Sequence, residues 1–141
     1  MSRLLYEQSV SYKGYLIIPF GLTDVNNQSI YSYKLLSQSG HKSKLHKSDN
    51  PEGTYANKLE RLIDIAKKYL DEHADIISKD DYFKHRYTYR NDLIIVYEEA
   101  NKYYYDHYKP HNLNNVAAPK IFSSERECIN WVKAGLDRSL Y

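Results

Sequence analysis

The sequence predicts an α+β domain built from two tandem β-β-(β)-α halves, which together form a mostly antiparallel sheet with two helices packed on one face. The first observation is a repeat, since YKGYLIIP at residues 12–19 matches YRNDLIIV at 89–96, an offset of 77 positions. The second is that LIDIAKKYLD at 62–71 matches CINWVKAGLD at 128–137, an offset of 66 positions. The third is a tyrosine-rich stretch between these blocks in each copy. A falling offset indicates a duplication whose second copy has shorter loops.

The strands are predicted from local composition. Each Leu-Ile-Ile run is β-rich and apolar, which favours a strand covered on both faces, and we expect residues 87–97 to form one long strand. The polar stretch 23–28, TDVNNQ, is typical of a turn between antiparallel strands, and 98–101, EEAN, of a tighter hairpin. A short third strand is expected at 119–122, PKIF, with a weaker counterpart at 44–46.

Apolar side chains at steps of three and four predict one helix in each half. The first stripe contains Leu59, Leu62, Ile63, Ala66, Tyr69 and Leu70, and the second contains Cys128, Ile129, Val132 and Leu136, with Trp131 on its flank. Residues 49–52, DNPE, predict the first helix start, since an Asx cap precedes a proline at the first helical position. Ser124 with Glu127 predicts a capping box at the second.

The totals favour one globular domain over residues 1–141, with halves at 10–73 and 87–138 and a linker at 74–86. Hydrophobic residues make up 42% and charged residues 27% of the chain, and the net charge of +2 is spread evenly. This balance gives no argument for a nucleic-acid or membrane partner. A single cysteine excludes an internal disulfide, and neither a signal peptide nor a membrane span is expected. A cytoplasmic location fits these features best.

The chain is rich in tyrosine, with 16 Tyr against 3 Phe and 1 Trp. Tyrosine favours strands and half-wet surfaces, because its ring is apolar and its hydroxyl is polar. Alternation along the expected strand 87–97 places Tyr87, Tyr89 and Tyr97 on one face. Ordinary cross-strand aromatic packing explains such a face. The alternative is that a second copy of the chain covers it, which predicts a homodimer.

Two basic clusters are candidate contacts for nucleic acid or a partner. The loop 41–47, HKSKLHK, contributes Lys42, Lys44 and Lys47. The second cluster contributes Lys84 and Arg86, interleaved with Tyr87 and Tyr89, as in single-strand binders that combine stacking with charge. The alternatives are a solvated loop and an ordinary tyrosine-rich strand, and no RNA-recognition signature of the RRM type is present.

No catalytic, cofactor-binding or metal-binding residues are predicted. The sequence contains no P-loop, dinucleotide fingerprint, nucleophile elbow or HExxH motif. Pro110 separates His107 from His111, and Cys128 belongs to the second apolar stripe. Asp92, Glu98 and Lys102 suggest a metal-dependent nuclease core only loosely.

The stretches YKGYLIIPF and KIFSSERECINWVK, with the tyrosine-rich strands between them, resemble small uncharacterised proteins of cyanobacteria. That resemblance implies a cytoplasmic protein and no particular activity. The residues favour a non-catalytic binding or regulatory module that acts through protein–protein contacts. A nucleic-acid-binding module and an enzyme of unrecognised type are the alternatives.

Overall fold

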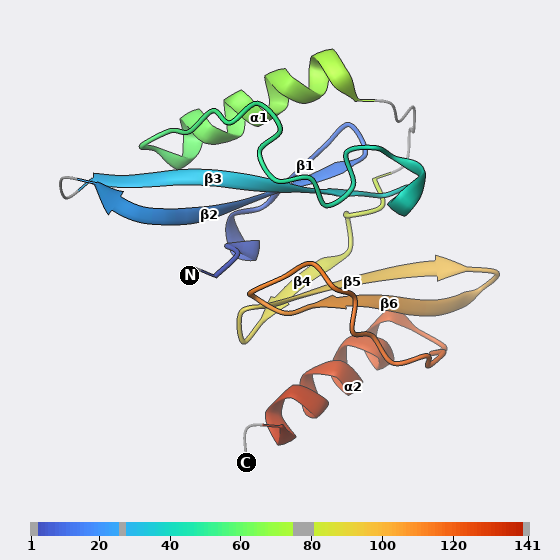
Figure 1. The fold of residues 1–141 in the computed structure, drawn as a ribbon. Coiled ribbons are helices and arrows are strands. Elements are labelled where there is room, and N and C mark those ends of the chain that lie inside the picture. Colours follow the sequence, from blue (N-terminus) through green and yellow to red (C-terminus); the bar gives the residue numbers. More distant parts are fainter. Residues whose placement is uncertain (1–2, 26–27, 75–80, 140–141) are drawn as a thin grey trace. The chain divides into compact units, whose positions relative to one another are not determined.

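Residues 3–25, 28–74 and 81–139 are described by a computed structural model. The chain forms two compact units, Met1–Lys84 and His85–Tyr141. The first contains β1 (Val10–Tyr12), β2 (Tyr15–Val25), β3 (Gln28–Ser37) and α1 (Leu59–His73), with short 3-10 helices at Tyr6–Gln8 and Gly40–Lys42. The second contains β4 (Arg86–Tyr89), β5 (Asp92–Glu99), β6 (Lys102–Tyr108) and α2 (Glu125–Arg138) (Figure 1).

The predicted α+β class and the twofold occurrence of a strand-strand-strand-helix pattern are confirmed. The strands lie in two antiparallel three-stranded sheets, in the orders β1-β2-β3 and β4-β5-β6, and not in one sheet. One helix packs on each sheet, as Figure 1 shows.

The third strand of each unit comes from a tight hairpin inside the repeated motif. In the first unit Tyr12 pairs with Tyr15, and the backbone φ angles of Lys13 and Gly14 between them are 49° and 82°. Two successive positive φ angles are the mark of a type I′ turn, whose twist matches that of the strands. In the second unit residues 90 and 91 have φ angles of 51° and 68°. The expectation of one continuous strand over 87–97 was therefore wrong.

This hairpin also changes which side chains share a face. Tyr87 pairs with Ile94, so both point to the α2 side of the sheet, whereas Leu93 and Tyr97 point to the other side. The expectation that Tyr87, Tyr89 and Tyr97 lie on one face was wrong for the same reason. The turn at 98–101 is a tight hairpin as predicted, since Glu99 pairs with Lys102. In the first half β2 and β3 are antiparallel as predicted, and Val25 pairs with Gln28.

Two other local expectations were wrong. Within the described residues, 119–122 forms no strand, since Phe122 makes only an isolated bridge to Tyr103, and 44–46 forms a turn. Helix α1 begins at Leu59 and not near Pro51. The Asn50 side chain bonds Thr54 through both its amide and its carbonyl group, which closes a turn where a helix cap was expected.

Each helix buries its predicted apolar stripe. Helix α1 buries Leu62, Ala66, Tyr69 and Leu70 against a core that contains Tyr33 and Leu35 of β3. Helix α2 buries Cys128, Ile129, Val132 and Leu136 against a core that contains Ile94, Val96, Tyr105 and Phe122. The Ser124 cap is confirmed, because its hydroxyl accepts a hydrogen bond from the N–H of Glu127 at 3.1 Å. No helix among the described residues is long and apolar enough to span a membrane.

The repeated residues of the first unit join its hairpin to its helix. The Tyr12 hydroxyl donates to Asp71 Oδ1 at 2.6 Å, and Lys13 Nζ lies 2.8 Å from the same oxygen. Lys67, one turn earlier on α1, places its ammonium 5.4 Å from the centre of the Tyr12 ring. The hydrogen bonds from Lys13 and Tyr12 lower the pKa of the Asp71 carboxyl.

The second unit repeats this arrangement with the equivalent residues. The Tyr89 hydroxyl and Arg90 Nε both donate to Asp137 Oδ1 at 2.7 Å, and Lys133 lies 5.3 Å from the centre of the Tyr89 ring. The hydrogen bonds from Tyr89 and Arg90 lower the pKa of the Asp137 carboxyl. Four side chains from two distant parts of the chain thus recur together, so the repeated motif has a structural role in attaching each hairpin to its helix.

Candidate binding cleft

One edge of the second sheet is the outer side of β6, and two segments of the following loop touch it. Near the start of β6, Tyr103 and Phe122 exchange two backbone hydrogen bonds of 2.9 Å. Near its end, the N–H of Val116 donates to the carbonyl of His107 at 2.8 Å. Backbone groups of alternate residues in an antiparallel strand point to the same side, so those of Tyr105 also face this edge. Among the described residues, no backbone hydrogen bond joins the N–H or C=O of Tyr105 to the loop.

A cleft of about 400 Å³ lies where the loop departs from the strand edge. Its strand side consists of Tyr97, Tyr104, Tyr105 and Asp106, and its loop side consists of Asn115 and residues 117–121. This volume falls in the lower part of the range of ligand-binding clefts. The cleft is built from one unit alone, so its shape depends only on the β5–β6 hairpin and the segment that leads to α2.

Aromatic rings form much of the wall. The rings of Tyr97 and Tyr104 are stacked, with centroids 5.6 Å apart and planes 19° apart. The Tyr105 hydroxyl accepts a hydrogen bond of 2.8 Å from the N–H of Ala118. This bond joins the loop to the tyrosine side chain and not to the backbone of β6. Ile121 lies at the rim with 55% of its surface exposed. The exposed wall of the cleft is therefore more apolar than polar.

The polar groups of the cleft are mostly neutral donors and acceptors. Burial raises the pKa of both Tyr97 and Tyr105, and the charges of Asp106 and Glu99 raise that of Tyr97 further. Asp106 accepts a hydrogen bond of 2.9 Å from the side-chain amide of Asn115. At neutral pH the tyrosines thus keep their protons, and the cleft combines stacked rings with hydrogen-bonding groups. Such a surface suits a neutral, partly apolar ligand.

Lys120 connects the cleft to the only tryptophan. Its ammonium lies 5.5 Å from the centre of the Phe122 ring and 5.4 Å from that of Trp131 on α2. Trp131 also contacts Tyr105 edge-on, with centroids 6.3 Å apart. A ligand that moves Lys120 or Tyr105 therefore changes the surroundings of the indole, which makes Trp131 a natural fluorescent reporter.

A buried polar pair lies on the same sheet. Asp92 Oδ2 is 2.7 Å from His107 Nε2 and 3.3 Å from the ammonium of Lys109. Both Asp92 and His107 are buried. Glu98, which the sequence grouped loosely with Asp92 and Lys102, lies six residues further along β5, roughly 20 Å away at 3.4 Å per residue. The structure therefore does not bring together the carboxylates of the suggested nuclease core.

The predicted basic loop is exposed in the first unit. Lys42, Lys44 and Lys47 are all exposed there, on the turns that follow β3. His46 is held inward, because its Nδ1 accepts a hydrogen bond of 3.1 Å from the N–H of Ser37. Burial and then the charges of Lys47 and His41 lower the pKa of His46. The loop can offer three lysine ammonium groups to an anion, and nucleic-acid binding through it stays a prediction.

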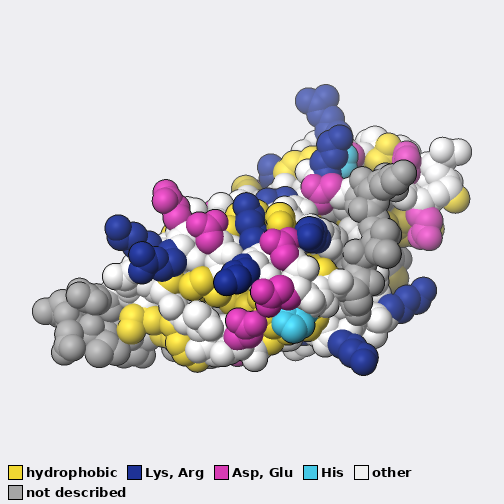
Figure 2. All heavy atoms as spheres, turned by 90° about the horizontal axis from the view of Figure 1, so that it is seen from above, with side chains coloured by type: hydrophobic (Ala, Val, Ile, Leu, Met, Phe, Trp, Pro, Cys, Tyr) yellow, Lys and Arg dark blue, Asp and Glu magenta, His cyan; other side chains and the backbone are white. Residues whose placement is uncertain are grey.

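The second predicted cluster is divided between the two units. Lys84 closes the first unit and is exposed, whereas Arg86, Tyr87 and Tyr89 belong to β4 of the second. The hydroxyl of Tyr87 donates to Glu125 and that of Tyr89 to Asp137, so both tyrosines are joined to acidic side chains of α2. On the face seen in Figure 2, Lys and Arg side chains are mixed with Asp and Glu and do not gather in a patch of one sign.

The cleft contains none of the residues predicted as contacts. Its sequence signal is weak, because Tyr97 and Tyr104 belong to a tyrosine-rich region and the loop side depends on the distant pairing of Phe122 with Tyr103. Neither a protein-family model, a curated protein nor a solved structure matches the chain.

Proposed function

We propose that the protein is a non-catalytic binding or regulatory module that acts through protein–protein contacts, and that its cleft binds an extended peptide segment of a partner. The observation that carries this proposal is that the outward N–H and C=O of Tyr105, at a strand edge inside an aromatic cleft, have no backbone partner among the described residues. An extended peptide that enters the opening between the two loop contacts can form main-chain hydrogen bonds with Tyr105, and pockets for its side chains give specificity.

The lining fits this partner in three ways. The outward N–H and C=O of Tyr105 match the acceptor and donor that one peptide residue presents. The stacked rings of Tyr97 and Tyr104 and the exposed side chain of Ile121 provide apolar surface for its side chains. Tyrosine is also a residue type that contributes strongly to binding energy at interfaces. We propose that another protein of the cytoplasm supplies the segment; if a second copy of the chain supplies it, the protein is a homodimer.

The test is selection from a phage-displayed library of short linear peptides, followed by titration of each selected peptide with Trp131 fluorescence as the readout. Ile121→Lys places a charge at the rim, and Tyr104→Ala removes one of the stacked rings. We expect either substitution to weaken binding by about tenfold or more. The matched control is Tyr55→Ala, because Tyr55 is an exposed tyrosine of the first unit. Failure to select any peptide, or equal affinity for all four proteins, would contradict the proposal.

A further inference from the structure

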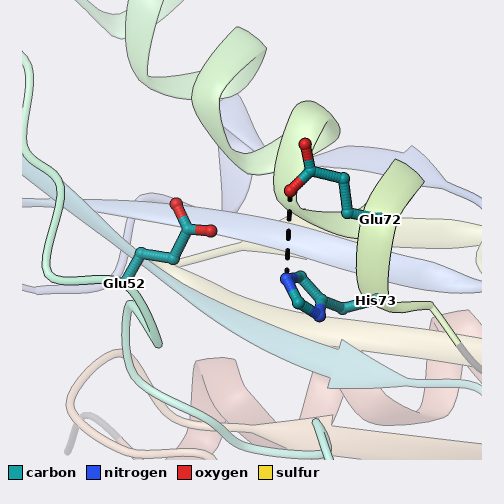
Figure 3. Close-up of side chains that lie close together, drawn as sticks. All are labelled: Glu52, Glu72 and His73. Carbon is teal, nitrogen blue, oxygen red and sulfur yellow. Dashed lines mark ion pairs between the residues drawn. The ribbon is translucent and has the colours of Figure 1, made fainter.

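Three potential metal ligands lie together on the first unit. Glu52 comes from the loop that follows β3, and Glu72 and His73 come from the last turn of α1 (Figure 3). One ligand atom of each residue lies within 4.8 Å of the others, and His73 Nε2 is 3.9 Å from Glu72 Oε2. All three side chains are exposed, so small rotations can bring the three atoms closer. Atoms that share a zinc ion through bonds of ~2.1 Å are roughly 3.4 Å apart in tetrahedral geometry.

Glu52 and Glu72 border a hollow of about 310 Å³ between the loop and the helix, which Tyr69 also lines. The Tyr69 ring lies against the His73 imidazole, with centroids 4.4 Å apart and planes 30° apart. This contact orients the imidazole on the exposed end of the helix. The ligands thus have room beside them for bound water, which a site with three protein ligands needs to complete its coordination.

One buried hydroxyl in the core under α1 has no hydrogen-bond partner among the described residues. Tyr33 is fully buried in the core under α1, together with Tyr69, and its hydroxyl has no hydrogen bond among the described residues. Burial raises the pKa of Tyr33 to about 12, and the charge of Glu52 is the next cause, which places its phenol in the field of this carboxylate. Leaving a buried hydroxyl without a partner is unfavourable. Tyr33 does not line the hollow, so this hydroxyl is not a ligand of the site.

The second unit shows that the fold does not need these ligands. At the offset of 66 positions that relates the two helices, Glu72 corresponds to Arg138 and His73 to Ser139. The attachment of hairpin to helix is kept in both units, whereas the carboxylate and imidazole occur only in the first. These side chains are therefore not part of what stabilises the repeated unit.

The local charge favours a cation. Two carboxylates lie at the C-terminal end of α1, where the helix dipole adds a partial negative charge. Lys68 is the one cation among the residues that line the hollow. One imidazole nitrogen and two carboxylate oxygens are ligands that suit Zn²⁺ and similar divalent transition metals. We propose that Glu52, Glu72 and His73 bind one divalent cation of the Zn²⁺ type, with water completing its coordination, and that the ion joins the 49–56 loop to the end of α1.

The experiment is calorimetric titration of the metal-free chain with Zn²⁺, with Co²⁺ absorption as a second readout. We expect one ion per chain, and affinity at least about tenfold lower in Glu52→Gln and in His73→Ala, because each loses one of three ligands. His111→Ala is the control, since His111 is an exposed histidine of the second unit. All the substituted side chains are exposed, and circular dichroism verifies that each variant folds. Absence of Zn²⁺ binding, or affinity unchanged in both ligand variants, would overturn the proposal.

Discussion

Replacing Asp92 by alanine tests the energetic role of the buried pair in the second unit. The carboxylate of Asp92 is 6% exposed and the His107 side chain 10%, with 2.7 Å between Oδ2 and Nε2. The substitution removes a hydrogen bond between groups that can carry charge, worth about 1.5–3 kcal/mol, and leaves the imidazole without this partner in a buried site. Lys109 is 47% exposed and contributes little, since solvent screens it. We expect a loss of about 3 kcal/mol in the free energy of unfolding.

Urea unfolding followed by Trp131 fluorescence measures this loss, because the only tryptophan lies in the same unit. The set comprises the wild type, Asp92→Ala, His107→Ala and the double variant. We expect the double variant to be more stable than the sum of the single losses implies, since the two residues contact each other. Asp64→Ala, an exposed carboxylate on α1, is the control and should change stability by less than about 0.5 kcal/mol. A loss below about 1 kcal/mol for Asp92→Ala, or strict additivity, would refute this reasoning.

Three further predictions concern other parts of the two units. The pKa values of Asp71 and Asp137 are lowered below their ordinary 3.8 by hydrogen bonds from the hairpins. Their stabilising contribution is therefore present above about pH 4 and is lost as the pH falls through the lowered values. In Asp137→Asn, the free energy of unfolding measured with urea should therefore fall less steeply as the pH is lowered below about 4. Burial raises the pKa of Cys128 to about 11, so Ellman's reagent at pH 8 should react with it only on unfolding; rapid reaction of the folded chain would contradict this burial. Gly14→Ala should lower thermal stability by about 1 kcal/mol, because φ is 82° there, whereas Asn91→Gly should be nearly neutral; equal losses would contradict the turn assignment.

The sequence was sufficient for the class, the repeat and the helices, because these depend on local periodicity. The hairpin inside the repeat was missed, although Lys13-Gly14 carries the glycine that a type I′ turn favours. Its equivalent, Arg90-Asn91, has no glycine, and the apolar residues on either side suggested one strand. The start of α1 was misplaced because Pro51 is a common helix-start residue, and the side-chain bonds of Asn50 to Thr54 are invisible in the sequence.

The roles of the tyrosines could be predicted only in part. Their preference for strands was clear, but Tyr12 and Tyr89 also bond acidic side chains more than 40 positions away in the chain, which no local pattern indicates. The cleft was unpredictable for a similar reason. It exists because Phe122 pairs with Tyr103 and Val116 bonds His107, and the segment between these two contacts leaves the strand edge open.

Amide hydrogen exchange at Tyr105, followed by NMR in the free chain and with a selected peptide, tests the proposed binding mode most directly. In the free chain we expect its amide to exchange faster than those of Tyr104 and Asp106, because the latter point toward β5. A bound peptide whose main chain pairs with the strand edge should slow exchange at Tyr105 strongly. Unchanged exchange at this amide with saturating peptide would show that the peptide does not pair with β6, and would contradict the proposed mode of binding.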